Sequence, residues 1–240
     1  MISQAFHAVV YDPLYNGLVY LVGILPTHDV GIAVVLLTIV VRILVFPLSR
    51  QAVKAQMAMK ELTPDIEALK KKYKDNKEEQ SKAIFALYKE RDVHPFSGLL
   101  LVLVQLPVLI GLYVVFARGG LPTIDSTLLY PFVRIPDAVN MEFLGIFDMN
   151  GHSIILAFFA AVTQFLYIRL SMGKPKTIDP SPVESTLSGD MAKSFDFTTR
   201  YAMPGMIAVI SYSVVAAAPL YWVTSNTAML IQEYLTGKRF

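Results

Sequence analysis

One charged residue, Arg42, lies inside an otherwise apolar stretch of 19 residues, Val30–Leu48. A stretch of this length matches the roughly 20 residues that a helix needs to cross a ~30 Å hydrocarbon core. An arginine inside the bilayer costs about 2.5–3.5 kcal/mol on insertion scales. Thr38, one helical turn earlier, shares its face. Because no other apolar stretch holds a carboxylate in its interior, Arg42 predicts a water-filled cavity open to one side; snorkelling to the nearer end is the alternative.

Other polar side chains also interrupt the apolar stretches. They are Gln105, Gln164, Thr224, Ser225 and Asn226. Amides and hydroxyls join helices to one another in membranes, at ~0.6–2 kcal/mol each. Any one of them taken alone therefore has this ordinary structural interpretation, and only their combination with Arg42 indicates a binding site.

The residue types that carry catalysis are missing or scattered. The chain has no cysteine, which excludes disulfides, thiolate metal ligands and cysteine nucleophiles. It has no G-x-x-x-x-G-K-[ST] phosphate loop. Its histidines, at positions 7, 28, 94 and 152, show no metal-ligand spacing. Glu233 is the single acid near the interior of an apolar stretch and sits at its end, which disfavours an ion-coupled transporter. We expect no enzyme activity, no cofactor and no metal site.

The composition is that of a membrane protein. Of the 240 residues, 54% are hydrophobic and 17% are charged, against about 25% charged in soluble proteins. A net charge of +2 gives no reason to expect a nucleic-acid partner. Five apolar segments are expected to span the bilayer, at residues 28–48, 96–117, 152–171, 200–217 and 218–235.

The last two spans come from one uncharged run of 32 residues, Tyr201–Gln232. This run is too long for one ordinary span, and Pro219 after three alanines offers a natural break. A single long helix is the alternative. The predicted fold class is thus an all-α polytopic membrane protein with five transmembrane helices.

The N-terminal segment, residues 1–27, is expected to form an amphipathic helix in the membrane interface. Asp12 is a candidate N-cap before Pro13. The apolar residues of Leu14–Leu25 recur at helical spacing, but twelve residues cover only ~18 Å. A short additional span is the alternative. Residues 1–29 contain no Lys or Arg, so no cleavable signal peptide is expected.

Residues 49–95 are rich in charge and are expected to form a cytoplasmic helical hairpin. One apolar stripe comprises Ile66, Leu69 and Tyr73, and a second comprises Ala83, Ile84, Leu87 and Tyr88. Asn76 followed by Glu79 resembles a capping box at the start of the second helix. A solvated charged spacer is the alternative, but two matching stripes favour a folded pair.

The distribution of basic residues predicts the orientation. With five spans, the hairpin, the loop 172–199 and the tail 236–240 share one side, and that side carries eighteen Lys and Arg when the span-end bases Arg169 and Arg200 are counted with it. The loop 118–151 on the other side carries two. The positive-inside rule then places the N-terminus outside and the C-terminus in the cytoplasm. The membrane is expected to be a bacterial plasma membrane.

Several motifs occur together in a characteristic order. The arginine of the first span is followed by FPLSRQ (residues 46–51), a charged hairpin with a break at Leu62–Pro64, QLPVLIGLY (105–113) and APLYWVTSNTAMLIQ (218–232). In this combination the chain resembles the YidC/Oxa/Alb family of membrane protein insertases over nearly its whole length, Asp12–Thr236. The resemblance implies a five-helix core around a hydrophilic groove that is open to the cytoplasm and the lipid.

The resemblance also implies a function and its residues. Family members deliver hydrophobic segments of nascent proteins into the bilayer without nucleotide hydrolysis. The family's groove arginine falls on Arg42, its third-span glutamine on Gln164, its last-span aromatic on Trp222, and a substrate-contact position on Thr38. The full set of residues expected to bind substrate is Thr38, Arg42, Gln105, Gln164, Tyr221, Trp222 and Asn226.

The expected partners are nascent membrane proteins and lipid, with the ribosome, the signal-recognition targeting machinery and the Sec translocon reached through the hairpin 49–95. In contrast to some members of the family, we expect no large extracytoplasmic domain and no lipoprotein signal in this chain, and its tail 236–240 is short. The short tail makes the hairpin the expected recruiting surface. Two other functions remain open from the residues alone, an anion transporter or channel that uses Arg42, and an assembly factor that moves no substrate.

Overall fold

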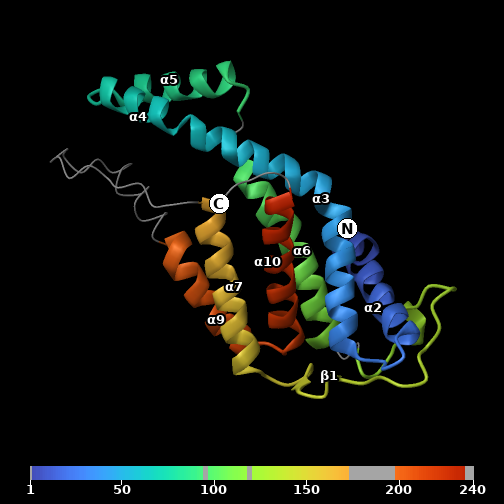
Figure 1. Ribbon diagram of the computed structural model, residues 1–240. Coiled ribbons are helices and arrows are strands. Elements are labelled where there is room, and N and C mark those ends of the chain that lie inside the picture. Colours follow the sequence, from blue (N-terminus) through green and yellow to red (C-terminus); the bar gives the residue numbers. More distant parts are fainter. Residues whose placement is uncertain (1, 94–96, 118–120, 173–197, 236–240) are drawn as a thin grey trace. The chain divides into compact units, whose positions relative to one another are not determined.

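The computed structural model describes residues 2–93, 97–117, 121–172 and 198–235, which are mostly helical (Figure 1). The chain divides into two compact units, residues 1–42 with 108–240 and residues 43–107. Two helices in the described part are long and apolar enough to cross a membrane, Val30–Gln51 and Ile154–Ser171. The mainly helical fold is confirmed, and the number of spans stays a prediction.

The N-terminal helix begins earlier than expected. Helix α1 (Ile2–Phe6) continues through a π-helical turn, η1 (His7–Tyr11), into α2 (Asp12–Ile24). Asp12 has helical dihedral angles, φ −62° and ψ −44°, so its assignment as an N-cap is wrong. Pro13 lacks an N–H and crowds the preceding turn, and the chain takes the wider π turn there instead of starting a new helix.

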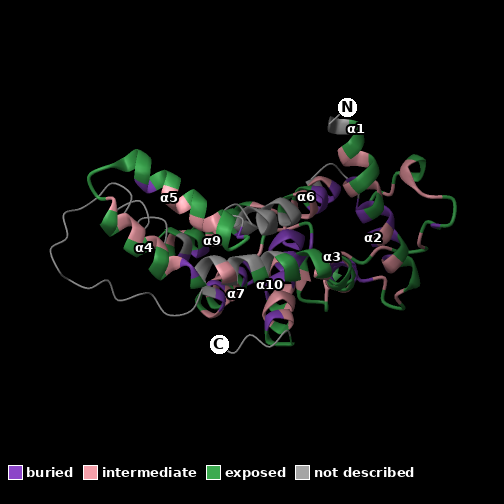
Figure 2. Ribbon diagram, turned by 90° about the horizontal axis from the view of Figure 1, so that it is seen from above, coloured by how far each residue is buried: buried purple, intermediate pink, exposed green. Residues whose placement is uncertain are grey.

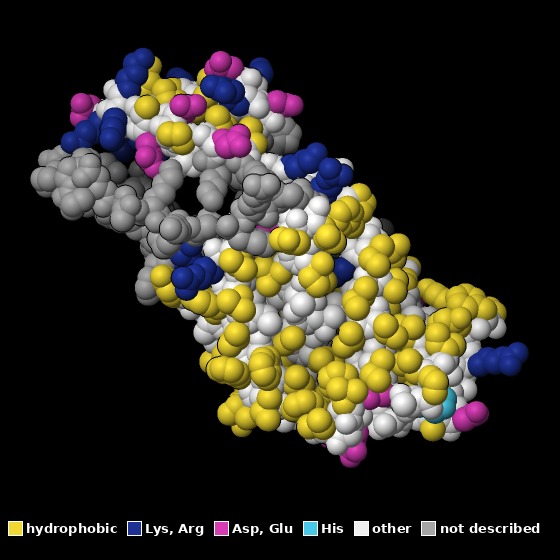
Figure 3. Space-filling view, in the orientation of Figure 1, with side chains coloured by type: hydrophobic (Ala, Val, Ile, Leu, Met, Phe, Trp, Pro, Cys, Tyr) yellow, Lys and Arg dark blue, Asp and Glu magenta, His cyan; other side chains and the backbone are white. Residues whose placement is uncertain are grey.

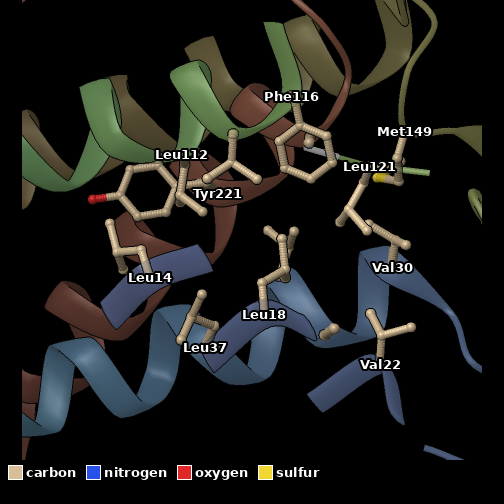
Figure 4. Packing of buried hydrophobic residues seen from close by; sticks show 14 of the residues in the cluster. Leu14, Leu18, Val22, Val30, Leu37, Leu112, Phe116, Leu121, Met149 and Tyr221 are labelled. Atoms are coloured by element: carbon tan, nitrogen blue, oxygen red, sulfur yellow. The ribbon is translucent and has the colours of Figure 1, made fainter. Parts of the chain in front are cut away.

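Helix α2 packs lengthwise against α3 (Val30–Glu61). Modelling a Cβ on Gly17 would place it 3.0 Å from Leu37. These two residues lie at equal distances from the connecting turn, so the two helices run antiparallel. The buried side chains of α2 form a core with α3 and α6 (Ser97–Ala117), and this core contains Leu14, Leu18, Val22, Val30, Leu37, Leu112 and Phe116 (Figure 4). The placement of this helix in the membrane interface, or as a short additional span, stays a prediction.

Helix α3 does not stop at residue 48, where the predicted first span ends. It runs for 32 residues to Glu61, with Pro47 in its interior. A proline inside a helix removes one hydrogen bond and can bend the helix without ending it. The helical part of the first span therefore continues into the segment that was expected to belong to the hairpin.

The unit of residues 43–107 contains the predicted hairpin, α4 (Thr63–Lys72) and α5 (Lys77–Glu90). Asn76 caps α5, because its side chain accepts a hydrogen bond from the Glu79 N–H at 3.2 Å. The residues beside the two predicted stripes are mostly exposed. The seven stripe residues themselves are all partly buried: Ile66, Leu69, Tyr73, Ala83, Ile84, Leu87 and Tyr88. The folded hairpin is confirmed and the spacer is excluded.

A buried glutamine that the sequence did not single out completes the hairpin. The Gln80 amide donates to the carbonyl oxygens of Lys70, at 2.9 Å, and of Tyr73, at 3.4 Å. These carbonyls lie at the end of α4, where a helix has no N–H groups of its own left to bond its last carbonyl oxygens. Burial raises the pKa of the nearby Tyr88 hydroxyl.

The segment between α6 and α7 (Ile154–Met172) is folded, not a free loop. It holds a 3₁₀ turn, η2 (Ser126–Leu128), and a small antiparallel pair, β1 (Glu142–Phe143) and β2 (Phe147–Asp148), which is a minor departure from an all-α fold. The Asp125 carboxylate accepts from the hydroxyl and the N–H of Thr127 at 2.6 and 2.9 Å, and these bonds lower its pKa.

Several side chains tie this segment to the helices, and Asn16 and Asp29 are two of them. Asn16 of α2 accepts from the Tyr130 N–H at 2.6 Å and donates to the Leu128 carbonyl at 2.9 Å. Asp29, just before α3, accepts from the N–H groups of Ile32 and Leu144, both at 2.9 Å. Both side chains are buried. The segment is thereby held at the end of the bundle where α3 begins.

The C-terminal apolar run forms two helices, as predicted, and the single long helix is excluded. A π turn, η3 (Thr198–Ala202), leads into α9 (Met203–Ser213), and α10 spans Ala217–Leu235. The break falls at residues 214–216 and not at Pro219, which lies in the first turn of α10, where a missing N–H costs nothing. The loop 172–199 and the tail 236–240 fall almost entirely outside the described residues.

Helix α7 packs against both α9 and α10, whereas α9 and α10 touch each other only slightly (Figure 1). The break before α10 is fixed by hydrogen bonds from the Ala216 N–H to the Gly151 carbonyl at 2.8 Å and from the Ala217 N–H to the Met149 carbonyl at 3.2 Å. Buried residues concentrate on α2 and on the first turns of α10 (Figure 2). The starts of α7 and α10 therefore lie at one end of the bundle.

The two units differ in surface chemistry (Figure 3). The hairpin helices carry charged side chains of both signs, while the visible surface of the helical bundle is largely hydrophobic. Large apolar side chains are exposed along the outer face of α7, among them Ile155, Phe158, Phe159 and Leu166. A helix bundle with such a surface fits a lipid surrounding.

Candidate functional site

Arg42 is buried, with 8% of its surface exposed, and it points at α10. Its Nε donates to the Ser225 Oγ at 2.9 Å, and its Nη2 donates to the same oxygen. Ser225 is fully buried. The sequence argument did not foresee a protein acceptor for the guanidinium, and α10 supplies one in the Ser225 hydroxyl, which links α3 to α10. The water-filled cavity stays a prediction.

Two tyrosines surround this contact. Tyr221, one turn before Ser225 on α10, and Tyr167 on α7 are both electrostatic neighbours of the guanidinium. Tyr221 is 2% exposed and belongs to the hydrophobic cluster, near Leu112 and Leu14 (Figure 4). Arg42 therefore lies where α3, α7 and α10 converge, as the expected site requires, but Tyr221 is a core residue as well as a neighbour of the charge.

Thr38 does not present a free hydroxyl to a groove. It is 1% exposed, and its hydroxyl donates to the Val34 carbonyl of its own helix at 2.6 Å. This bond is the usual way in which a helical threonine satisfies itself. The Thr38 hydroxyl is therefore directed at the α3 backbone, and its contact with substrate stays a prediction.

The remaining predicted residues differ in accessibility. Asn226 is buried and donates to the Thr163 Oγ of α7 at 3.4 Å. Gln164 and Trp222 are partly exposed, and Gln164 makes no hydrogen bond within the described part of the chain. Gln105 lies in α6, but its side chain is outside the described residues. The structure thus groups Arg42, Tyr221 and Asn226 around α10, and leaves Gln164 and Trp222 available at a surface.

Three functional candidates were missed by the sequence reasoning. Ser225 was noted only as one polar residue among several, although it directly precedes Asn226. Glu233 was placed at the end of a span, but it is 2% exposed and accepts from the Ser171 Oγ at 2.6 Å. Tyr167 is a neighbour of both Ser171 and Glu233. The spacing of Tyr167 and Ser171, one turn apart, was the available signal.

The arrangement offers binding and electrostatics, with no sign of a metal centre. Among the described residues, no group of three His, Asp or Glu side chains converges to hold an ion. What the site presents is one buried positive charge, a set of hydroxyls and amides, and partly exposed side chains on α7 and α10. Such a set can attract and orient a polar or anionic segment.

The comparisons with known proteins agree with this chemistry. The model of the family "60Kd inner membrane protein" matches residues 23–240. The chain is 30% identical to a "Membrane protein insertase YidC" of Fusobacterium nucleatum over 232 residues, which cover 96% of this chain and 98% of that protein. It is 32% identical to one of Clostridium perfringens over 203 residues, 85% and 76% of the two chains.

A longer relative matches as well. A "Membrane protein insertase YidC" of Acidiphilium cryptum is 29% identical over 231 residues, which are 92% of this chain but 35% of that protein. The match to the helical core is therefore found in short and in long relatives alike. On this evidence the chain belongs to the 60Kd inner membrane protein family, the YidC/Oxa family of membrane protein insertases.

Proposed function

We propose that this membrane protein insertase, which is not an enzyme, guides a nascent apolar segment along α7 and α10 while Arg42 attracts the polar tail that must cross the bilayer. The observation that carries the proposal is the buried guanidinium held against Ser225. A fixed positive charge in surroundings of low dielectric constant acts strongly on a nearby anion. The charge therefore favours substrates with short acidic tails.

The driving force on this proposal comes from the substrate. Each apolar side chain that leaves water contributes about 1.5–3 kcal/mol, so a segment of ~20 residues needs no nucleotide hydrolysis to enter a bilayer. The partly exposed Gln164 and Trp222 are proposed contacts for that segment. Thr38, Tyr221 and Asn226, which are buried, are proposed to support the site from within, and Gln105 to extend it on α6.

We further propose that the chain crosses the bacterial plasma membrane five times, with the N-terminus outside. The charge asymmetry of the loops supports this topology. In this topology the hairpin of α4 and α5 faces the cytoplasm, and its mixed charges suit it to meet the ribosome, the targeting machinery or the Sec translocon.

Reconstitution into liposomes tests the role of Arg42. Two single-span substrates that differ only in an acidic or an uncharged N-terminal tail are compared on the wild-type protein, Arg42→Ala and Arg42→Lys. At an effective dielectric constant of about 20, one charge pair at about 8–16 Å is worth ~1–2 kcal/mol. Arg42→Ala should therefore lower insertion of the acidic-tailed substrate roughly five- to thirtyfold, while Arg42→Lys retains most activity.

Arg134→Ala, which removes an exposed arginine of the segment before α7, is the matched control and should have no effect. An equal loss for both tails would refute the electrostatic role. A wild-type protein that promotes insertion of neither substrate would refute the proposed function itself.

A further inference from the structure

The contact between α7 and α10 is lined by a pair of polar bridges. At one level the Asn226 amide donates to the Thr163 Oγ at 3.4 Å, and at the next the Ser171 Oγ donates to the Glu233 Oε1 at 2.6 Å. Eight residues separate the two positions on α7 and seven separate them on α10, about two helical turns in each. The two helices therefore run parallel and in matching register, and we name these four residues the polar seam.

Tyr167 lies between the two levels of the seam. Thr163, Tyr167 and Ser171 are spaced by four residues, so they occupy one face of α7. Tyr167 is a neighbour of Ser171 and Glu233 and also of Arg42. The hydrogen bond between Ser171 and Glu233 fixes both side chains, because losing either partner would leave a buried polar group unsatisfied.

The seam determines which way Ser225 points. Successive residues of an α-helix are rotated by about 100°, so Ser225 and Asn226 face different neighbours. Asn226 and Glu233, seven residues apart, lie on one side of α10, toward α7. When that side is bonded to α7, the neighbouring position 225 is directed at α3, where its Oγ accepts from Arg42. A small rotation of α10 about its axis would separate the Ser225 Oγ from the Arg42 guanidinium.

We propose that Ser171 and Glu233 are positioning residues that hold α10 in the register required by the Arg42–Ser225 contact, and that the seam stays closed during insertion. The substrate then passes along the outer surface of α7 and α10 and not between them. The inference rests on the proposed function and adds that α7 and α10 stay joined to each other while the substrate passes along their outer surface. It also gives the buried Glu233 a role in the electrostatic selectivity of the site.

Ser171→Ala tests the positioning role, because it removes one hydroxyl and keeps Glu233. The readout is the ratio of acidic-tailed to uncharged-tailed insertion, which a general loss of folded protein would not change. We expect this ratio to fall about three- to tenfold, the factor by which one hydrogen bond between membrane helices biases an equilibrium. Ser213→Ala is the matched control, since the Ser213 hydroxyl is exposed and bonded to the Val209 carbonyl of its own helix; its ratio should match the wild type.

A thiol pair tests whether the seam stays closed. The chain has no cysteine, so Ser171→Cys with Glu233→Cys gives the single pair, which is joined by oxidation or by a short reducible thiosulfonate linker. With the bond formed, the protein should insert substrate at least as well as after reduction. The yield of the bond should also be unchanged when a stalled nascent chain occupies the protein.

Opposite results would overturn the inference. Activity that disappears on linking and returns on reduction, or a bond yield that falls when a nascent chain is present, would mean that α7 and α10 separate during insertion. A Ser171→Ala ratio equal to that of the wild type would refute the positioning role, whatever the thiol variants do. If Arg42→Ala still lowers the ratio in that case, the proposed function stands and only the inference fails.

Discussion

Asn16 offers a sharp test of how α2 is held. It is 2% exposed, and its side chain makes three hydrogen bonds. The bond to the Asp12 carbonyl is local, within one turn of α2, but those to Leu128 and Tyr130 cross more than a hundred residues of sequence. Replacing Asn16 with alanine removes both long-range bonds and leaves a backbone donor and acceptor without this partner.

The cost follows from these two bonds. Each is worth about 0.5–1.5 kcal/mol net, so Asn16→Ala should destabilise the protein by about 1–3 kcal/mol. For a chain of this size that corresponds to a fall of about 2–12 °C in the midpoint of thermal unfolding. The midpoint can be measured in detergent as the loss of the folded peak on size-exclusion chromatography after heating.

The matched control is Asn150→Ala, because Asn150 is an exposed asparagine of the same segment whose side chain makes no hydrogen bond within the described part of the chain. Its midpoint should stay at the wild-type value. If Asn16→Ala and Asn150→Ala unfold at the same temperature, Asn16 does not fasten α2 to this segment, and other contacts must do so, such as the Tyr15 hydroxyl that accepts from the Asp125 N–H at 2.8 Å.

Three further perturbations address other contacts. Gly31→Ala would place a Cβ 2.4 Å from the Phe143 ring, so it should cost about 1–3 kcal/mol and lower the unfolding midpoint, whereas Gly205→Ala, which meets open space, should not. Gln80→Ala should speed hydrogen exchange at the end of α4 and the start of α5 by removing the bonds to Lys70 and Tyr73; unchanged protection would contradict that role. Asp125 has a lowered pKa, so its stabilising contribution to the local fold is present above the ordinary value near 3.9 and is lost as pH falls through the lower folded value. Asp125→Asn should remove any such pH dependence of the local hydrogen-exchange rates. A change of these rates confined to about pH 6–8 would be inconsistent with this role of Asp125.

The sequence predicted well those features that depend on local periodicity. The stripes of α4 and α5 and the Asn76 cap needed only residues within a few turns of one another. The division of the C-terminal run into two helices also followed from its length. Neither the predicted end of the first span at residue 48 nor Asp12 is a helix boundary, because a helix that is stabilised along its whole length can pass through a proline or over a capping residue.

Long-range contacts could not be predicted in this way. Asn16 and Asp29 looked like ordinary polar residues near helix ends, and their partners lie in a segment about 110 residues away. Glu233 looked like a residue at a membrane boundary because hydropathy records where charges stop, not what lies beside them. Its burial against Ser171 depends on the packing of α7 on α10, which no periodicity within either helix reports.

The three consecutive polar residues of α10 show most clearly what packing adds. In the sequence, Thr224, Ser225 and Asn226 form one polar patch. In the structure the Thr224 hydroxyl donates to the Leu220 carbonyl of α10 itself, the Ser225 hydroxyl accepts from Arg42 of α3, and the Asn226 amide donates to Thr163 of α7. Rotations of about 100° per residue separate these directions. A substitution in this patch therefore disturbs a different helix at each position, and only the one at Ser225 acts on the buried charge directly.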